Sequence, residues 1–205
     1  MDGRTAVGGY VLAGGKSLRM GRDKALLVLE GETLVERCLR KLSEVADEVA
    51  IAGGTEALAR FGRVVPDAEP GCGPLGGIVA ALAESRFEWN VFVPVDVPFV
   101  PVECLKELVA AAMDSGEAGM ARVDGELQPL CAVYPKTMLP GLRRELDAGR
   151  GKVVLAVAAA GPVRVVDFAD ARWFRNVNTP EEFAAAQAEK VRLAAFAKRP
   201  GAKAP

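Results

Sequence analysis

Short apolar runs alternate with helical repeats along most of the chain, and this alternation limits the possible folds more than any other feature. The predicted strands are residues 10–13, 48–52, 63–65, 91–95, 119–123, 128–134 and 163–166, and predicted helices cover residues 75–84, 101–113, 136–146 and 152–160. Strands that alternate with helices favour parallel pairing, because a helix returns the chain across the sheet. The sequence therefore predicts an α/β layer fold with a mostly parallel sheet.

Two helix starts carry capping signals. Thr33 and Glu36 have the spacing of a capping box, and apolar residues then recur at helical spacing, so a helix joins the first strand to the second. A last helix is predicted to begin at Thr179, with Pro180 in the first helical position and Glu182 closing the box.

The chain has 205 residues, of which 50% are hydrophobic, and this is enough for one well-packed domain. We place that domain at residues 9–196. Residues 1–8 and 197–205 have too little apolar content to pack, so both ends are expected to be mobile.

The charge balance excludes a general attraction to polyanions. The 26 basic and 27 acidic residues give a net charge of −1, so we expect neither nucleic acid nor a membrane as a partner. No apolar run approaches membrane-spanning length, and the first residues lack the apolar core of a signal peptide. We expect a cytoplasmic protein.

The counts of cysteine and histidine narrow the chemistry. The four cysteines are Cys38, Cys72, Cys104 and Cys131; none forms a CxxC pair, and they are predicted to be reduced thiols in or near the core. The chain has no histidine, which excludes a Ser-His-Asp triad and imidazole metal ligands. Any catalysis must use carboxylates, lysine, arginine, backbone amides or a hard metal ion.

The first predicted strand leads into VLAGGKSLRMGRDK, a loop of glycines and cations. A P-loop would need a glycine where Tyr10 stands, so the pattern is not that of a P-loop. Gly14 and Gly15 permit a turn that presents backbone N–H groups, while Arg19 and Lys24 add positive charge. Glycine turns and charged loops are each common, but their combination favours phosphate binding.

Asp96 ends the apolar run of the fourth predicted strand, in the sequence Val95-Asp96-Val97-Pro98. An aspartate before a proline often only organises a turn. The carboxyl ends of parallel strands meet at one edge, however, so Asp96 is expected beside the phosphate loop. A carboxylate there suits Mg²⁺, which takes few protein ligands.

Gly71, Gly73 and Gly76 match the pattern GxGxxG, and Asp96 follows about 20 residues later, as in a dinucleotide-binding fingerprint. An NAD-binding oxidoreductase is therefore an alternative. Against it, prolines stiffen a loop that should turn tightly, and the first glycine loop would have no role. A glycine-rich wall for a nucleotide base or sugar, including Gly76, explains the segment better.

Three amide side chains are candidates for recognising a polar heterocycle, because they offer donors and acceptors without charge. They are Gln128, Asn176 and Asn178. Asn178 and Thr179 also fit the start of the last helix, so the interpretation favours a binding role for Asn176.

Taken together, LAGGKSLRMGRDK, the Asp67 loop with GPLGG, the DVP at Asp96, QPL and NVNTPEE resemble the molybdenum cofactor guanylyltransferase family in content and order. The resemblance runs from the first strand to the final helix. It implies a single three-layer Rossmann-like nucleotidyltransferase domain that attaches GMP from GTP to molybdopterin with Mg²⁺. It also implies a monomer that makes transient contact with molybdopterin-handling proteins and molybdoenzyme chaperones.

Site residues follow from the resemblance by position. The residues that would bind the nucleotide are Leu12, Ala13, Gly14, Gly15, Lys24 and Asp67, and those that would face the pterin are Asn176 and Asn178. Lys24 would bind phosphates, Asp67 would help recognise guanine, and Asp96 would hold Mg²⁺. The chain departs from the family at Ala52, where an asparagine can stand near the base, whereas Gly15 resembles the guanylyl rather than the cytidylyl enzymes.

The implied reaction is in-line attack by the terminal phosphate of molybdopterin on the α-phosphorus of GTP. A phosphate monoester has a second pKa of about 6, so the attacking group needs no histidine base at neutral pH. Arg19, Lys24 and the amides near Gly14 would stabilise the leaving pyrophosphate. The alternatives are a transferase that uses CTP or another phosphorylated acceptor, the NAD-binding oxidoreductase, and a non-catalytic nucleotide-binding assembly factor.

Overall fold

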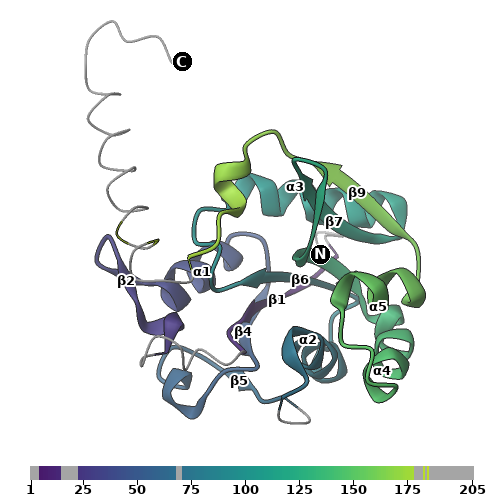
Figure 1. Ribbon diagram of the computed structural model, residues 1–205, viewed down its shortest axis with the longest axis horizontal. Coiled ribbons are helices and arrows are strands. Elements are labelled where there is room, and N and C mark those ends of the chain that lie inside the picture. Colours follow the sequence, from purple (N-terminus) through teal and green to yellow (C-terminus); the bar gives the residue numbers. More distant parts are fainter. Residues whose placement is uncertain (1–4, 15–22, 68–70, 178–181, 183, 185–205) are drawn as a thin grey trace, which may run out of the picture.

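The computed structural model describes residues 5–14, 23–67, 71–177, 182 and 184. Its main sheet has seven strands in the order β5-β4-β1-β6-β8-β7-β9 (Figure 1). Their bounds are β1 (Val7–Leu12), β4 (Glu48–Ala52), β5 (Val64–Val65), β6 (Trp89–Pro94), β7 (Ala118–Val123), β8 (Glu126–Pro135) and β9 (Val163–Asp167). Neighbouring strands are parallel except where β8 pairs with β6 and β7. The predicted mostly parallel sheet is therefore confirmed.

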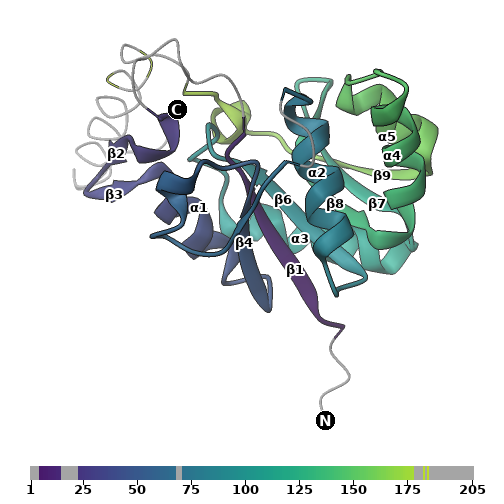
Figure 2. The same cartoon turned by 90° about the horizontal axis from the view of Figure 1, so that it is seen from below.

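Helices cover both faces of the sheet. The longer ones are α1 (Leu34–Leu42), α2 (Gly73–Glu84), α3 (Val102–Ser115), α4 (Leu139–Asp147) and α5 (Val153–Ala160). Buried residues of α1 and α3 pack in one hydrophobic core, and those of α2, α4 and α5 pack in a second core. Figures 1 and 2 show these two helix layers on either side of the strands. The three-layer architecture is as expected.

The strand β1 explains how one sheet serves two cores. All its residues are buried. Side chains alternate between faces along a strand, so Val11 packs in the core of α1 and α3, while Tyr10 and Leu12 pack in that of α2. A strand buried on both faces reads as a continuous apolar run, and this is why the sequence pattern predicts it.

The capping box predicted for α1 is present. The Thr33 hydroxyl accepts a hydrogen bond from the Glu36 amide at 3.3 Å, and the Glu36 carboxylate accepts one from the Thr33 amide at 2.9 Å. These bonds satisfy amides that the first turn leaves unpaired. The direction of α1 is thus set where it leaves the preceding hairpin.

Several short elements differ from the predictions or were not predicted. The sequence pattern did not predict the hairpin β2 (Val28–Leu29) and β3 (Glu32–Thr33), whose turn has positive φ at Glu30 and Gly31. The predicted helix 136–146 divides into η4 (Lys136–Met138) and α4. The other short helices are η2 (Lys24–Leu26), η3 (Glu56–Leu58) and η5 (Ala171–Phe174).

The start of β1 lies two residues before the predicted domain boundary at residue 9. Val7 is only 3% exposed, and its amide donates to Asp47 Oδ2 at 2.8 Å, so this residue belongs to the packed sheet. Residues 1–4, the tail 197–205 and the helix start predicted at Thr179 lie outside the described residues. Within the described residues, none of the helices has the length and apolar character needed to cross a membrane.

Candidate functional site

Four parallel strands bring their carboxyl ends to one rim of the sheet. Beyond the last residue of β1, the Ala13 amide donates to the Ala52 carbonyl at 3.0 Å, and the Val95 amide donates to the Leu12 carbonyl at 3.0 Å. The Gly53 amide likewise donates to the Val65 carbonyl at 2.9 Å. The loops that follow β1, β4, β5 and β6 therefore begin side by side, as expected for a ligand site in a parallel sheet.

Lys24 and Asp96 meet at this rim although 72 residues separate them in the sequence. Lys24 Nζ donates to Asp96 Oδ2 at 3.2 Å, and the two side chains are 16% and 26% exposed. Lys24 opens η2, and Asp96 follows β6. A cation and a carboxylate are thus paired at a partly solvated position that an anionic ligand and a cation could both reach.

Asp23 orients the start of η2 beside this pair. Its carboxylate accepts a hydrogen bond from the Ala25 amide at 3.0 Å and another from the Thr55 hydroxyl at 3.2 Å. Asp23 therefore connects the segment of Lys24 to the loop after β4. An aspartate that caps a turn two residues ahead is a local sequence signal, but the contact with Thr55 depends on the fold.

Glycines allow two of the rim loops to touch through their backbones. A Cβ added at Gly14 would lie 3.0 Å from the Gly53 carbonyl oxygen, and one at Gly53 would lie 2.9 Å from Asp67 Oδ1. Gly53 also has a φ of +69°, which side-chain-bearing residues rarely adopt. The result is a surface of bare backbone next to the Asp67 carboxylate.

Asp67 points into this glycine-lined surface. Its Oδ1 is buried and has no hydrogen-bond partner among the described residues. Burial raises the pKa of the Asp67 carboxyl above its ordinary value. A buried acceptor without a donor is costly, so the site is suited to a ligand that donates a hydrogen bond there.

The glycines at the start of α2 complete this wall. A Cβ on Gly77 would approach Asp67 Oδ1 to 3.4 Å, and a Cβ on Gly76 would lie 3.9 Å from the same oxygen and 2.8 Å from the Cys72 Cβ. Gly76 therefore serves both the packing of the helix start and the space around Asp67.

The alternative dinucleotide fingerprint is wrong for this fold. The strand before the glycines, β5, ends at Val65, whereas α2 begins at Gly73, so no tight strand-to-helix turn exists. β4 and β1 also lie between β5 and β6 in the sheet. Asp96 therefore does not follow the strand adjacent to the glycine loop, as the fingerprint requires.

Asn176 comes to the same rim from the other end of the chain. The amide of its neighbour Val177 donates to the Asp96 carbonyl at 2.8 Å. Val177 is fully buried and Asn176 is exposed, so the backbone is anchored while the amide side chain remains accessible. Gln128 lies near the start of β8, four residues before Ala132, which pairs with Phe92 of β6. Because β8 runs antiparallel to β6, Gln128 lies toward the carboxyl end of β6.

The structure therefore brings together most of the predicted site residues. Leu12, Ala13, Gly14, Lys24, Asp67, Gly76, Asp96 and Asn176 lie at or next to the rim. Gly15, Arg19 and Asn178 lie outside the described residues. Ala52 is fully buried with its side chain in the α2 core, so the rim position after β4 belongs to Gly53.

The predicted thiol state is confirmed for the four cysteines. All are free; Cys38, Cys104 and Cys131 are buried, and Cys72 is partly buried. Burial raises the pKa of the Cys38 thiol to about 12, so this sulfur stays protonated at neutral pH. None of these thiols belongs to the polar contacts described at the rim.

A family model described as the MobA-like NTP transferase domain matches residues 9–164. A probable molybdenum cofactor guanylyltransferase of Pelotomaculum thermopropionicum is 37% identical over 187 residues, which cover 87% of this chain and 91% of that protein. A molybdenum cofactor guanylyltransferase of Vibrio atlanticus is 36% identical over 84% of this chain and 91% of its own. The solved structure of molybdopterin-guanine dinucleotide biosynthesis protein A from Archaeoglobus fulgidus shares the fold, with a TM-score of 0.72, 24% identity and coverage of 90% and 99% of the two chains.

Proposed function

The chain belongs to the MobA-like NTP transferase family, and from this premise we propose that it transfers GMP from GTP to the terminal phosphate of molybdopterin. The products are molybdopterin guanine dinucleotide and pyrophosphate. The relatives named molybdenum cofactor guanylyltransferase support this activity, since each aligns over most of both chains. The observation in the structure that carries the proposal is the pairing of Lys24 with Asp96 at 3.2 Å.

The residues at the rim fit a divalent ion that is held mainly by its substrate. Within the described ranges, no group of three or more His, Cys, Asp or Glu could hold a metal alone. Mg²⁺ needs no such group, because it is commonly bound by one or two carboxylates together with phosphates and waters. Asp96 would supply that carboxylate, and the ion, when bound, would neutralise charge on the phosphates.

Lys24 is placed to bind the phosphates of GTP. With an anionic nucleotide in the site, the Lys24 ammonium can exchange the Asp96 carboxylate for a phosphate oxygen, a contact with full opposite charge. Gly14 packs against the Gly53 backbone, and the backbone amides near Gly14 are proposed to bind the phosphates with Lys24. Arg19, in the same loop of the sequence, is proposed to share this role.

The acceptor phosphate can attack without a protein base. Its second pKa of about 6 leaves it mostly dianionic at neutral pH. A bond forms between an acceptor phosphate oxygen and the α-phosphorus, and the bond to the bridging oxygen breaks, so pyrophosphate leaves with that electron pair. The protein contributes alignment and charge stabilisation, which dominate phosphoryl transfer in general.

Asp67 is proposed to select the base. Guanine carries N–H donors on its Watson–Crick edge, and Asp67 Oδ1 is a buried acceptor that lacks a donor among the described residues. A Cβ at Gly53 or Gly77 would lie 2.9 or 3.4 Å from this oxygen, so the adjoining glycines keep other side chains from crowding it. Asn176, next to the Asp96 segment, and Asn178 are proposed to contact the pterin of the acceptor.

The test is a transfer assay with purified protein, Mg²⁺, molybdopterin and each of GTP, CTP and ATP. Pyrophosphate release and the mass of the dinucleotide are measured. Formation of both products is expected with GTP. A parallel reaction in which Mn²⁺ replaces Mg²⁺ compares the two metals. Product formed only with CTP would show that CTP is the substrate. GTP binding without pyrophosphate release would show that the protein binds the nucleotide without catalysing transfer.

We propose that the enzyme acts as a cytoplasmic monomer with a single domain, whose packed sheet begins at Val7 and not at the predicted boundary of residue 9. Its product must pass to a molybdoenzyme, so transient contact with molybdopterin-handling proteins and molybdoenzyme chaperones is expected. Light scattering on the purified protein measures the oligomeric state directly.

A further inference from the structure

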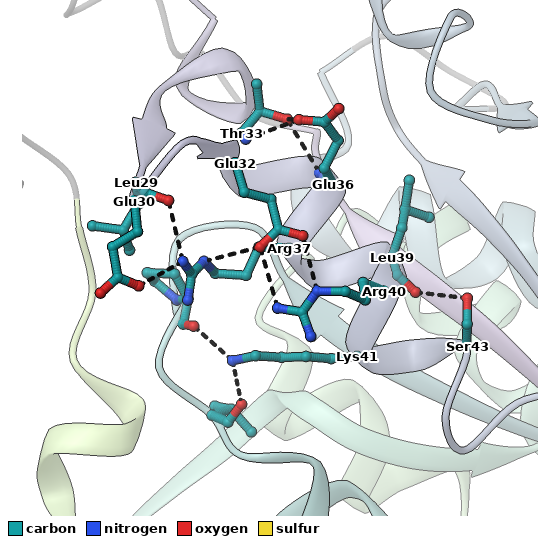
Figure 3. Close-up of polar contacts among 12 residues, drawn as sticks. Leu29, Glu30, Glu32, Thr33, Glu36, Arg37, Leu39, Arg40, Lys41 and Ser43 are labelled. Carbon is teal, nitrogen blue, oxygen red and sulfur yellow. Dashed lines mark hydrogen bonds and ion pairs between the residues drawn. The ribbon is translucent and has the colours of Figure 1, made fainter.

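Lys41, in the last turn of α1, reaches the segment that follows Asp96. Its Nζ donates to the Pro98 carbonyl at 2.7 Å and to the Val100 carbonyl at 2.6 Å. Figure 3 shows these hydrogen bonds as dashed lines, beside the separate ion pairs of Arg37 and Arg40 with the hairpin. Lys41 thus links α1 to the backbone just past Asp96.

This segment has few backbone partners of its own. Residues 97–101 form neither helix nor strand, and the prolines at 98 and 101 have no N–H to donate. Among the described residues, the Val97 amide donates to the Pro94 carbonyl at 3.3 Å and the Val100 amide donates to the Val97 carbonyl at 3.5 Å, and both bonds are long. Both valines are buried, so the local carbonyls need donors from elsewhere. Lys41 supplies two charge-assisted hydrogen bonds.

We propose that Lys41 is a positioning residue, which holds the segment 97–100 so that the Asp96 carboxylate faces Lys24 and the nucleotide. This inference rests on the proposed function. The Asp96 backbone is otherwise held by β1, through the Val95 amide, and by the Val177 amide. Lys41 adds two hydrogen bonds from α1 to the segment after Asp96, in addition to the packing of Val97 and Val100 in the core that α1 shares.

The charge of Lys41 also acts on the same buried region as that of Asp96. Both groups influence the buried Cys38 thiol, Lys41 lowering its pKa and Asp96 raising it. Both side chains therefore act on the same part of the interior, where charges are poorly screened. Lys41→Met removes this charge together with both hydrogen bonds.

The test compares Lys41→Met with Ser43→Ala. Ser43 lies at the same end of α1, where its hydroxyl donates to the Leu39 carbonyl at 2.9 Å, away from the Asp96 segment. Binding of Mn²⁺–GTP is measured by water-proton relaxation, and the Mg²⁺ requirement is measured in the transfer assay. Lys41→Met is expected to lower the affinity for Mn²⁺–GTP about tenfold, as when a residue that orients a metal ligand is lost. The Mg²⁺ concentration needed for transfer is expected to rise by about the same factor. Ser43→Ala should change neither, and Lys41→Arg should recover most of the loss.

The outcomes separate the two proposals. If the wild type does not transfer GMP but Lys41→Met still weakens Mn²⁺–GTP binding, the function is wrong and the positioning role stands. If the wild type is active and Lys41→Met matches Ser43→Ala in both readouts, differing only in melting temperature, Lys41 is merely structural. Should Lys41→Met fail to fold, Lys41→Gln, which removes the charge but keeps one donor group, is titrated against the same control.

Discussion

Side chains at the rim of the sheet are set by their immediate neighbours. Lys24 follows the cap that Asp23 forms at η2, and Asp96 is anchored through its own carbonyl to Val177. Asp67 faces glycines, and its buried Oδ1 has no hydrogen-bond partner among the described residues. Each of these residues can therefore be tested by a substitution that changes metal dependence, catalysis, stability or GTP binding.

Replacing Asp96 by asparagine is expected to abolish GMP transfer while the fold is retained. The change keeps the side-chain size but removes the charge that would hold the metal. Pyrophosphate release and circular dichroism measure the two effects, with Asp114→Asn on the exposed side of α3 as the matched control. Undiminished transfer by Asp96→Asn would contradict the metal assignment.

Lys24→Ala is expected to lower kcat/KM, with a loss of transition-state stabilisation of about 2–4 kcal/mol. This is the range seen when one preorganised donor is removed. The steady-state constants are measured beside Lys106→Ala, an exposed lysine on α3. A higher KM with an unchanged kcat would show that Lys24 binds the ground state and transition state equally.

Asp67→Asn is expected to stabilise the free protein at neutral pH. Burial raises the pKa of Asp67 in the folded state, so the folded protein holds the proton more tightly than the unfolded chain does. The free energy of unfolding therefore falls as the pH rises from the ordinary pKa of 3.8 to the raised pKa of the folded state. It is regained on acidification. Melting curves should show a gain for Asp67→Asn at pH 7 that shrinks toward pH 3.8.

The same substitution should weaken GTP binding, because the asparagine amide is a poorer acceptor for guanine donors than a carboxylate. Calorimetric titration at pH 7 measures this. A variant that is neither more stable nor weaker in binding would contradict the assignment of Asp67.

Gly53→Ala is expected to lose stability and GTP binding together. The positive φ costs about 1–3 kcal/mol for a residue with a side chain, and the new methyl group meets Asp67 Oδ1. Gly31→Ala is the control, since Gly31 also has a positive φ but nothing lies within 4 Å of its added Cβ. Equal losses of GTP binding in both variants would show that backbone strain, and not the site, is responsible.

Among the elements, α1 contacts both the β2–β3 hairpin and the segment that follows Asp96. Its first turn is capped by Thr33, its middle holds the β2–β3 hairpin through Arg37, and its last turn reaches the Asp96 segment through Lys41. The Arg37 guanidinium donates to the Leu29 carbonyl at 3.1 Å and pairs with Glu30 at 2.8 Å. The helix thus contacts the segments that follow Lys24 and Asp96 in the sequence.

Thr33→Ala removes the hydroxyl of the capping box and is expected to cost about 1 kcal/mol of unfolding free energy. Denaturant unfolding measures it, with Thr137→Ala, an exposed threonine in η4, as the control. An equal change in the two variants would mean that the cap does not stabilise α1 measurably.

Local patterns predicted these elements to differing degrees. The capping box and the apolar spacing of α1 identified it, because both signals lie within a few residues of one another. The hairpin was missed because two-residue strands leave no periodicity to detect. The predicted helix 136–146 divides where α4 begins at Leu139, with Pro140 in its first turn, after the tighter turn of η4.

For the whole molecule, the order of strands decides what the motifs can do. The glycines of residues 71–76 follow β5 at one edge of the sheet, whereas Asp96 follows β6, with two strands between them. The same order places β6 beside β1, and Asp96, just after β6, is within hydrogen-bond distance of Lys24. One sheet order therefore excludes the dinucleotide fingerprint and brings together the proposed metal ligand and phosphate-binding lysine.

The sequence by itself determined the α/β class, most strand and helix positions, the capping box and the motif residues of the family. Each of these depends on side-chain periodicity or on residues that are neighbours along the chain. Only the tertiary structure decided the antiparallel placement of β8, the burial of the Asp67 Oδ1 atom, the contact of Val177 with Asp96 and the hydrogen bonds of Lys41 to the segment after Asp96. These features depend on which distant segments pack together, and local patterns carry no record of that.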